Sequence, residues 1–177
     1  MAIITRLLKG HDMDQGNGEW VAANKKLLGK TLLEVGSVIV KGQEGICLRN
    51  YISNAVEKYV GIDVRAGNGV DVVGDASNMP FVDNSFDSVV CLDMLEHCKY
   101  PHEIFKESFR VTVPGGYLFL ATVFDFPVHY HDNDYFRFTH NGLRLMAEDA
   151  GYEVIECPRD IELTKPGIVK IIARKPE

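Results

Sequence analysis

Residues 31–63 read TLLEVGSVIVKGQEGICLRNYISNAVEKYVGID and decide the fold. Two apolar runs, Thr31–Val35 and Lys58–Asp63, frame a segment whose apolar residues recur at helical spacing. The first run closes on Gly36, and the second ends on the carboxylate of Asp63. Strand, turn, helix and strand form one βαβ unit. Such a unit predicts a nucleoside-binding half-site, because the turn brings backbone N–H groups to a ligand and the acid accepts from ribose hydroxyls.

The composition is that of a globular protein. The chain has 177 residues, of which 46% are hydrophobic and 25% charged, and we predict a single domain over residues 1–177. The net charge of −6, without a cluster of Lys and Arg, argues against nucleic-acid binding. No apolar run approaches the roughly 20 residues that span a bilayer, so we predict no membrane association. Four cysteines without a C-x-x-C pair predict free thiols in a reducing cytoplasm.

The rest of the chain alternates between helical and strand patterns. Expected helices are Gly18–Leu28 (with Asn17 as its cap), Gly45–Glu57, Pro101–Val111 and Asn141–Ala150. Expected strands are Thr31–Val35, Lys58–Asp63, Val70–Gly74, Phe86–Leu92, Tyr117–Val123, Tyr152–Cys157 and Ile168–Ala173. This order predicts an α/β fold, a doubly wound and mostly parallel seven-stranded sheet with helices on both faces and a C-terminal antiparallel hairpin. Residues 1–28 would form an N-terminal helical cap.

A long polar and aromatic insert interrupts the alternation at residues 125–138. Inserts of this length in compact domains are usually functional or disordered, and the aromatic content argues against disorder. We expect it to be the substrate side of the site, with His129 or His131 as a catalytic base. Its apolar lining would be Tyr135, Phe136 and Phe138.

Two alternatives concern the charged residues of this insert. The pattern His129-x-His131-Asp132-x-Asp134 can be read as metal ligands, but a loop of small polar steps has no fixed geometry, so we predict no metal. Arg137 would either bind a substrate anion or pair with Asp134 or Glu148.

Acids stand at the ends of three successive expected strands: Asp63, Asp75 and Asp93. Because the carboxyl ends of parallel strands line the ligand crevice in such sheets, we expect these acids along one edge. The chain has no G-x-G-x-x-G, so no turn is shaped for a pyrophosphate, which disfavours an NAD-dependent reductase. Acceptor groups suit an uncharged, donor-rich adenosine better than a phosphate, which they would repel.

Six motifs follow one another between residues 30 and 123. They are Leu32-Leu33-Glu34-Val35-Gly36, Val60-Gly61-Ile62-Asp63, Gly74-Asp75-Ala76 with Met79-Pro80-Phe81, Asn84-Ser85-Phe86-Asp87, Leu95-Glu96-His97 and Val113-Pro114-Gly115-Gly116-Tyr117. In this order they resemble class I S-adenosylmethionine-dependent methyltransferases of the small, single-domain, Rossmann-like kind. The run Asp134–Thr139 resembles one that follows strand five in one branch of that family. The resemblance implies S-adenosylmethionine as cofactor and a small-molecule or glycan-like methyl acceptor.

The resemblance also implies roles for the first two motifs. Glu34 would orient the turn after the first strand. Gly36 and Ser37 would let the methionine part of the cofactor approach the backbone. Asp63 would hold the ribose hydroxyls, with a solvated strand end as the structural alternative.

Further roles follow for the third and fourth strand ends. Asp75 would accept from the adenine amino group, with the Ala76 N–H on the ring, although Gly-Asp-Ala is also good turn chemistry. The backbone near Asp93 would face the methionine amine, while its side chain could equally cap the next segment. His97 is expected to make a structural hydrogen bond.

The chain departs from the family pattern in one loop. The usual G-x-G-x-G is here GSVIVKGQEG at residues 36–45, where Val38–Val40 place β-branched residues in a loop that often needs positive φ. In an alternative interpretation these residues prolong the strand, and the chain is a non-catalytic module that binds cofactor weakly or acts through a protein partner. The sequence leaves open the acceptor, the choice between O-, N- and C-methylation, and the oligomeric state, a homodimer included.

Overall fold

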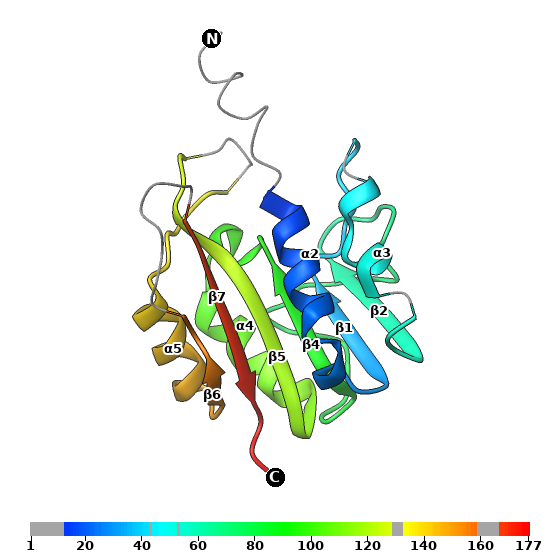
Figure 1. The fold of residues 1–177 in the computed structure, drawn as a ribbon, viewed down its shortest axis with the longest axis vertical. Coiled ribbons are helices and arrows are strands. Elements are labelled where there is room, and N and C mark those ends of the chain that lie inside the picture. The colour runs from blue at the N-terminus through cyan, green and yellow to red at the C-terminus, as the bar shows by residue number, and fades with distance from the viewer. Residues whose placement is uncertain (1–12, 43, 53, 129–132, 159–166) are drawn as a thin grey trace, which may run out of the picture.

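The computed structural model describes residues 13–42, 44–52, 54–128, 133–158 and 167–177 (Figure 1). Its strands are β1 Thr31–Val35, β2 Lys58–Asp63, β3 Val72–Val73, β4 Phe86–Leu92, β5 Thr112–Asp125, β6 Glu153–Glu156 and β7 Gly167–Arg174. Its α-helices are α2 Met13–Ala23, α3 Leu48–Ile52, α4 Pro101–Val111 and α5 His140–Asp149. Short 3₁₀ turns are η1 Lys25–Leu27, η2 Glu44–Ile46 and η3 Leu95–His97.

The strands form a seven-stranded sheet in the order β3-β2-β1-β4-β5-β7-β6. β1 pairs in parallel with β2 and β4, β2 with β3, and β4 with β5, whereas β7 runs antiparallel to β5 and β6. The predicted fold class is therefore confirmed. The terminal hairpin inserts β7 between β5 and β6, so β6 is the outer strand. The carboxyl ends of the parallel strands lie together at the upper end of the sheet in Figure 1.

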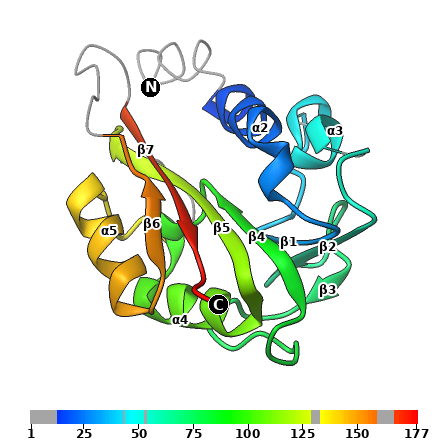
Figure 2. The same ribbon diagram turned by 60° about the horizontal axis from the view of Figure 1, so that its bottom comes forward.

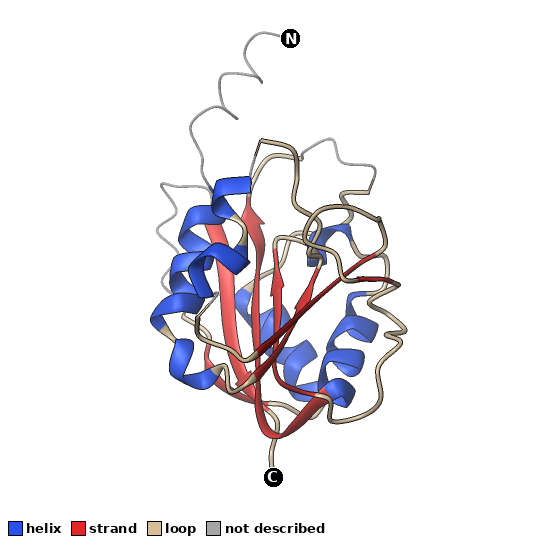
Figure 3. Cartoon of the chain, turned by 90° about the vertical axis from the view of Figure 1, so that its right-hand side faces the viewer, coloured by secondary structure: helices blue, strands red, loops and turns tan. Residues whose placement is uncertain are grey.

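Helices cover both faces of the sheet. Figure 2 shows α2 and α3 on one side and α4 and α5 on the other, and Figure 3 shows the strands running between the two groups. Neighbouring strand residues point to opposite faces, so Leu32 packs with α2 and α3 while Leu33 packs with α4 and α5. Both leucines are fully buried, which explains why β1 reads as a continuous apolar run.

Two of the predicted helices agree closely with the structure, and both have local signals at their starts. α4 begins on Pro101, whose missing N–H costs nothing in the first turn, and it ends on Val111 as predicted. α5 is capped by Thr139, whose hydroxyl accepts from the Gly142 N–H at 3.1 Å, as predicted. No helix among the described residues is long and apolar enough to cross a membrane.

Three other bounds were wrong. The first helix begins at Met13 and ends at Ala23, with η1 after it, so Asn17 lies inside the helix and is not its cap. The second keeps only five residues of α helix, Leu48–Ile52. The third strand keeps only two, Val72–Val73. β3 is the outermost strand at its end of the sheet, where it pairs with β2.

Candidate functional site

The carboxylate of Asp63 joins two loops at the end of β2. Its side chain is almost buried, with the residue 7% exposed. Oδ2 accepts from the Val38 N–H at 3.2 Å, and Oδ1 accepts from the N–H and Nε of Arg65 at 2.9 and 3.3 Å. A solvated strand end does not describe this residue. Asp63 is a buried acceptor that faces the turn after β1, where the sequence placed it.

The turn after β1 leaves the strand at once. Gly36 has φ of +81°, a conformation that residues with a Cβ rarely adopt. The N–H groups of Gly36 and Ser37 both donate to the carbonyl of Ile62, at 2.9 and 3.2 Å. β1 ends at Val35, so the interpretation of Val38–Val40 as its prolongation is wrong.

Glycines on the facing segment make room for the β-branched loop. The Ile39 N–H donates to the carbonyl of Asn68 at 2.8 Å, which brings the loop against the turn that follows β2. A Cβ on Gly69 would lie 2.4 Å from the Ser37 carbonyl oxygen, and one on Gly67 would lie 2.7 Å from Val38 Cγ2. These two glycines therefore let the turn after β2 pack closely against the β-branched loop after β1.

The carboxylate of Glu34, near the end of β1, accepts a hydrogen bond from a tyrosine on the neighbouring strand. Tyr59 on β2 donates its hydroxyl to Glu34 Oε2. Burial and the neighbouring Glu34 raise the pKa of Tyr59 above its usual range, so the phenol remains a donor. The Arg49 guanidinium lies 4.4 Å from the Tyr59 ring centroid and pairs with Asp71, which accepts from the Gly61 N–H. Sequence reasoning missed this network, because it depends on a pairing register that no local motif encodes.

The acids of the next two strand ends lie in different surroundings. Asp75 is exposed, and its Oδ1 accepts from the N–H and hydroxyl of Ser77, both at 2.8 Å. This is the turn chemistry that the sequence offered as an alternative. Ala76 beside it is buried. A role for Asp75 and Ala76 in holding adenine stays a prediction.

Asp93 meets the N-terminal helix at the end of β4. It takes a positive φ of +49°, and its N–H donates to the carbonyl of Ala121 at 2.9 Å. Its Oδ2 accepts from Nδ2 of Asn17 at 2.7 Å. Asn17 is fully buried within α2, four residues before the buried Val21. From the sequence, Asn17 was predicted only as a helix cap, and this contact was missed. Its spacing from Val21, which puts an amide on the apolar face of a helix, is the signal that could have indicated it.

Two buried polar atoms beside these residues have no hydrogen-bond partner among the described residues: Asn17 Oδ1 and Ser37 Oγ. Their residues are 0% and 3% exposed. An unsatisfied buried acceptor or hydroxyl costs about 1–3 kcal/mol. Such atoms are therefore expected where a polar ligand completes the site. Together with Asp63 and Asp93 they would suit a ligand rich in donor groups, and such a ligand stays a prediction.

The insert after β5 is only partly described. His129 and His131 lie outside the described residues. Tyr135 is 48% exposed, donates its hydroxyl to Asn133 Oδ1 at 2.8 Å, and donates its N–H to the carbonyl of Glu96 at 2.9 Å. In the part of the chain that the structure describes, no three His, Cys, Asp or Glu side chains gather as a metal site.

Arg137 forms hydrogen bonds with both described parts of the insert, which lie before residue 129 and after residue 132. Its Nε donates to the carbonyl of Phe126, and Nη2 donates to that of Pro127, at 2.9 and 3.0 Å. Both terminal nitrogens pair with Asp134, whose side chain is 4% exposed, and Nη1 also donates to the carbonyl of Phe136. These five bonds use every donor of the guanidinium, so the pairing with Asp134 is confirmed and a substrate anion has no donor left. We call Arg137 and these partners the Arg137 clasp.

Hydrogen bonds of the motif Leu95-Glu96-His97 connect the Arg137 clasp to the sheet. Glu96 is buried, its Oε2 accepts from the Thr122 hydroxyl at 2.8 Å, and its carbonyl accepts from the Tyr135 and Phe136 N–H groups. Nδ1 of His97 lies 2.5 Å from the Asn133 carbonyl. The structural hydrogen bond expected of His97 is thus observed. The segment after β5 lies against the end of β4.

Comparison with known proteins agrees with this geometry. Residues 45–120 match the family model of a methyltransferase domain. The ubiquinone biosynthesis O-methyltransferase of Dechloromonas aromatica is 31% identical over 125 residues, which cover 64% of this chain and 53% of the relative. The chain thus spans about half the length of the curated relatives it matches.

Solved structures show the same fold at low identity. An S-adenosylmethionine-dependent methyltransferase from Aquifex aeolicus superposes with a TM-score of 0.68 at 18% identity, covering 98% of this chain and 97% of the other. The 1,6-didemethyltoxoflavin-N1-methyltransferase of Burkholderia thailandensis gives 0.70 at 14% identity, covering 97% and 81%. The likeness to these structures shows that the chain has the same fold. The chain is thus similar to S-adenosylmethionine-dependent methyltransferases in its fold and over the matched domain.

Proposed function

We propose that the chain transfers a methyl group from S-adenosylmethionine to a small-molecule acceptor. The observation that carries this proposal is the arrangement of residues at the carboxyl ends of the parallel strands. Asp63 ends β2 and Asp93 follows β4, the two parallel strands that flank β1 and its Gly36 turn. The match to the methyltransferase domain includes both acids. Ligands in open α/β sheets bind at the carboxyl ends of the strands, next to such a turn.

The described residues suit the parts of this cofactor. Asp63 would hold the ribose hydroxyls with lone pairs beyond those that accept from Val38 and Arg65. Asp75 and Ala76 would take the adenine edge. Gly36 and Ser37 would lie against the methionine part, and Asn17 and Asp93 would accept from its ammonium group, which supplies the donor that Asn17 Oδ1 lacks.

Methyl transfer requires that the acceptor is aligned with the methyl group and that water is excluded from the site. The cofactor supplies an activated methyl on a sulfonium, so the chain's residues have to orient the acceptor and keep the site dry. α2 and the clasped insert are the described elements that border the edge of the sheet, at residues 93 and 96. A histidine of the insert, His129 or His131, stays our predicted base for an acceptor proton, with Tyr135 as a neighbouring residue.

The acceptor is proposed to be a small molecule methylated on oxygen. A relative that matches 64% of this chain is named as an O-methyltransferase, which favours oxygen over carbon. A solved neighbour of the same fold is titled as an N-methyltransferase with a bound small molecule, so fold alone does not choose the atom. The partners proposed are this acceptor and the cofactor, without nucleic acid.

A second candidate is a module of the same fold that no longer transfers methyl groups. It is favoured by the loop after β1, where the N–H groups of Gly36 and Ser37 already donate to Ile62. Weak or absent cofactor binding would distinguish this module from an enzyme. We also propose a reducing cytoplasmic location, because all four cysteines are free thiols.

Asp63→Ala is the substitution that tests the cofactor assignment. We expect calorimetry to show S-adenosylhomocysteine binding weakened by about 1.5–3 kcal/mol, the usual value of hydrogen bonds to a charged group. Asp83→Ala is the matched control. That carboxylate is 69% exposed, lies at the opposite end of β4 and pairs with Arg110, so its removal should leave the affinity unchanged. Equal affinities in the two variants would remove Asp63 from the site.

A further inference from the structure

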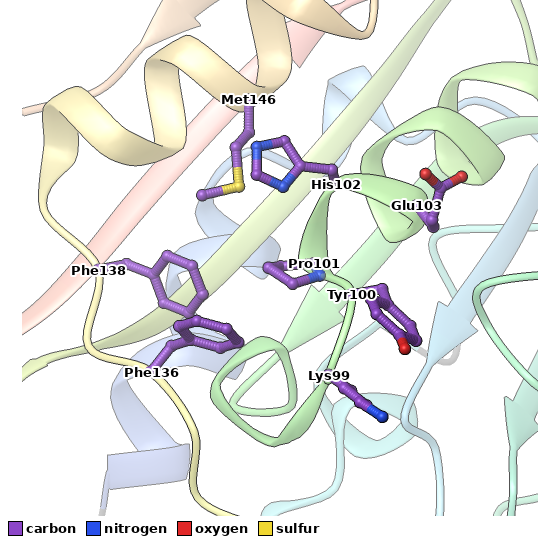
Figure 4. Close-up of a pocket in the computed structure, with 8 residues that line it drawn as sticks. All are labelled: Lys99, Tyr100, Pro101, His102, Glu103, Phe136, Phe138 and Met146. Carbon is purple, nitrogen blue, oxygen red and sulfur yellow. The ribbon is translucent and has the colours of Figure 1, made fainter.

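A groove separate from the acids of the sheet edge lies between the insert, the start of α4 and α5. Its volume is about 450 Å³, within the range of pockets that hold small ligands. Four apolar side chains form its floor and walls: Pro101, Phe136, Phe138 and Met146 (Figure 4). None of them belongs to the residues assigned to the cofactor.

The aromatic wall of the groove is built by the Arg137 clasp. Phe136 and Phe138 flank Arg137, and their N–H groups donate to Glu96 and Val123 carbonyls at 3.3 and 2.9 Å. Their rings are tilted, with centroids 5.7 Å apart. Phe138 is 4% exposed, whereas Phe136 keeps 39% of its surface exposed over the groove. With Phe138, Pro101 and Met146, the exposed part of Phe136 forms a contiguous apolar surface in the groove, and contiguous apolar surfaces mark binding sites.

The rim of the groove carries an ammonium group, although the chain as a whole has a net charge of −6. Lys99 and His102 line it, and its one carboxylate in the described lining, Glu103, pairs with Lys106 at 2.8 Å. Lys99 lies over the ring of Tyr100 at 5.2 Å. The rim therefore offers an ammonium and imidazole nitrogens above an apolar floor. Its charge complements an anion that carries an apolar ring.

We propose that this groove binds the ring of the methyl acceptor, and that the acceptor is an aromatic molecule bearing an anionic group such as a carboxylate. The inference rests on the proposed function, because it places the second substrate beside the first. The groove begins at Phe136, whose N–H contacts Glu96, three residues after Asp93 at the end of β4. The ring would thus lie on the α4 and α5 side of the sheet edge.

Two fluorescent probes with the same aromatic body test the proposal on the whole chain. Anilinonaphthalene sulfonate carries a negative charge, and phenylnaphthylamine is neutral. We expect the sulfonate to bind the parent. Lys99→Glu should weaken the sulfonate at least about fivefold and leave the neutral probe within about twofold, since only the former contacts the rim charge. Phe136→Ala should weaken both probes by about fivefold or more.

Controls separate the groove from non-specific surface and from the cofactor site. Leu145→Ala removes another exposed apolar side chain, 57% exposed on α5 but outside the groove, and should change neither probe. Near-ultraviolet circular dichroism checks that each variant is folded. Saturating S-adenosylhomocysteine should leave probe affinity within about twofold, because the two sites share no assigned residue.

Each result decides the question. Three results would contradict the claim that the groove is a separate binding site. They are failure of the parent to bind the sulfonate, displacement of the probe by S-adenosylhomocysteine, and equal behaviour of Phe136→Ala and Leu145→Ala. Equal binding of both probes, unaffected by Lys99→Glu, would overturn the anionic class. If the probes behave as expected while S-adenosylhomocysteine does not bind, the proposed function fails instead. The groove then stands as a site, but its assignment to a methyl acceptor falls.

Discussion

Gly36→Val should abolish the binding of S-adenosylhomocysteine. The residue has φ of +81°, where a β-branched side chain is strained, and its Cβ would lie 2.9 Å from Cβ and Cγ of Met94. Either the turn shifts or Met94 is displaced, and both changes reach the surface assigned to the methionine part of the cofactor. We expect affinity to fall at least about 100-fold, or about 2.7 kcal/mol, in a calorimetric titration.

Gly45→Val is the control for this change. It lies in η2, at the end of the connection that Gly36 begins, has no positive φ, and a Cβ there meets no atom within 4 Å. The control should bind like the parent, while the far-ultraviolet circular dichroism spectrum of both variants stays near native. Binding by Gly36→Val within about twofold of the parent would show that the Gly36 turn does not contact the cofactor.

Arg137→Ala should cause the largest loss of stability among the charged residues of the insert. It removes five hydrogen bonds and leaves the Asp134 carboxylate buried without its guanidinium partner. Breaking such a pair costs about 3–5 kcal/mol, at the lower end here because Arg137 itself is 23% exposed. Urea unfolding measures this loss. Turnover should fall with it, because the clasp holds Phe136 and Phe138.

Arg144→Ala is the matched comparison. Arg144 pairs with Glu148 at 3.4 Å on the exposed face of α5, an interaction that contributes about 0.3–0.5 kcal/mol. Arg137→Lys should recover little of the lost stability, since an ammonium cannot reproduce the planar fork toward Asp134. A loss in Arg137→Ala no larger than in Arg144→Ala would mean that the clasp does not organise the insert.

The sequence predicted the fold because its signals are local. Pro101 at a helix start, Thr139 as a cap and the alternating faces of Leu32 and Leu33 each follow from neighbours along the chain. The doubly wound, mostly parallel sheet followed from the alternation of strand and helix patterns along the chain. The acids at the strand ends were predicted for the same reason, since a strand's end fixes the edge on which its last residue lies.

The site's supporting contacts could not be predicted in this way. Asn17 reaches Asp93 across 76 positions, and the Tyr59 hydroxyl reaches Glu34 across 25. Arg137 satisfies carbonyls ten and eleven residues away, so its competing interpretations could be separated only in three dimensions. The β-branched loop after β1 looked unfavourable because the glycines that accommodate it, Gly67 and Gly69, lie on another segment.

Calorimetric titration of the unmodified chain with S-adenosylmethionine and S-adenosylhomocysteine tests the central claim most directly. The buried Asp63, the Gly36 turn and the unsatisfied Asn17 Oδ1 predict one site per chain with micromolar affinity, about −7 to −8 kcal/mol. No heat of binding at millimolar ligand, from a chain whose circular dichroism shows the native fold, would contradict the account.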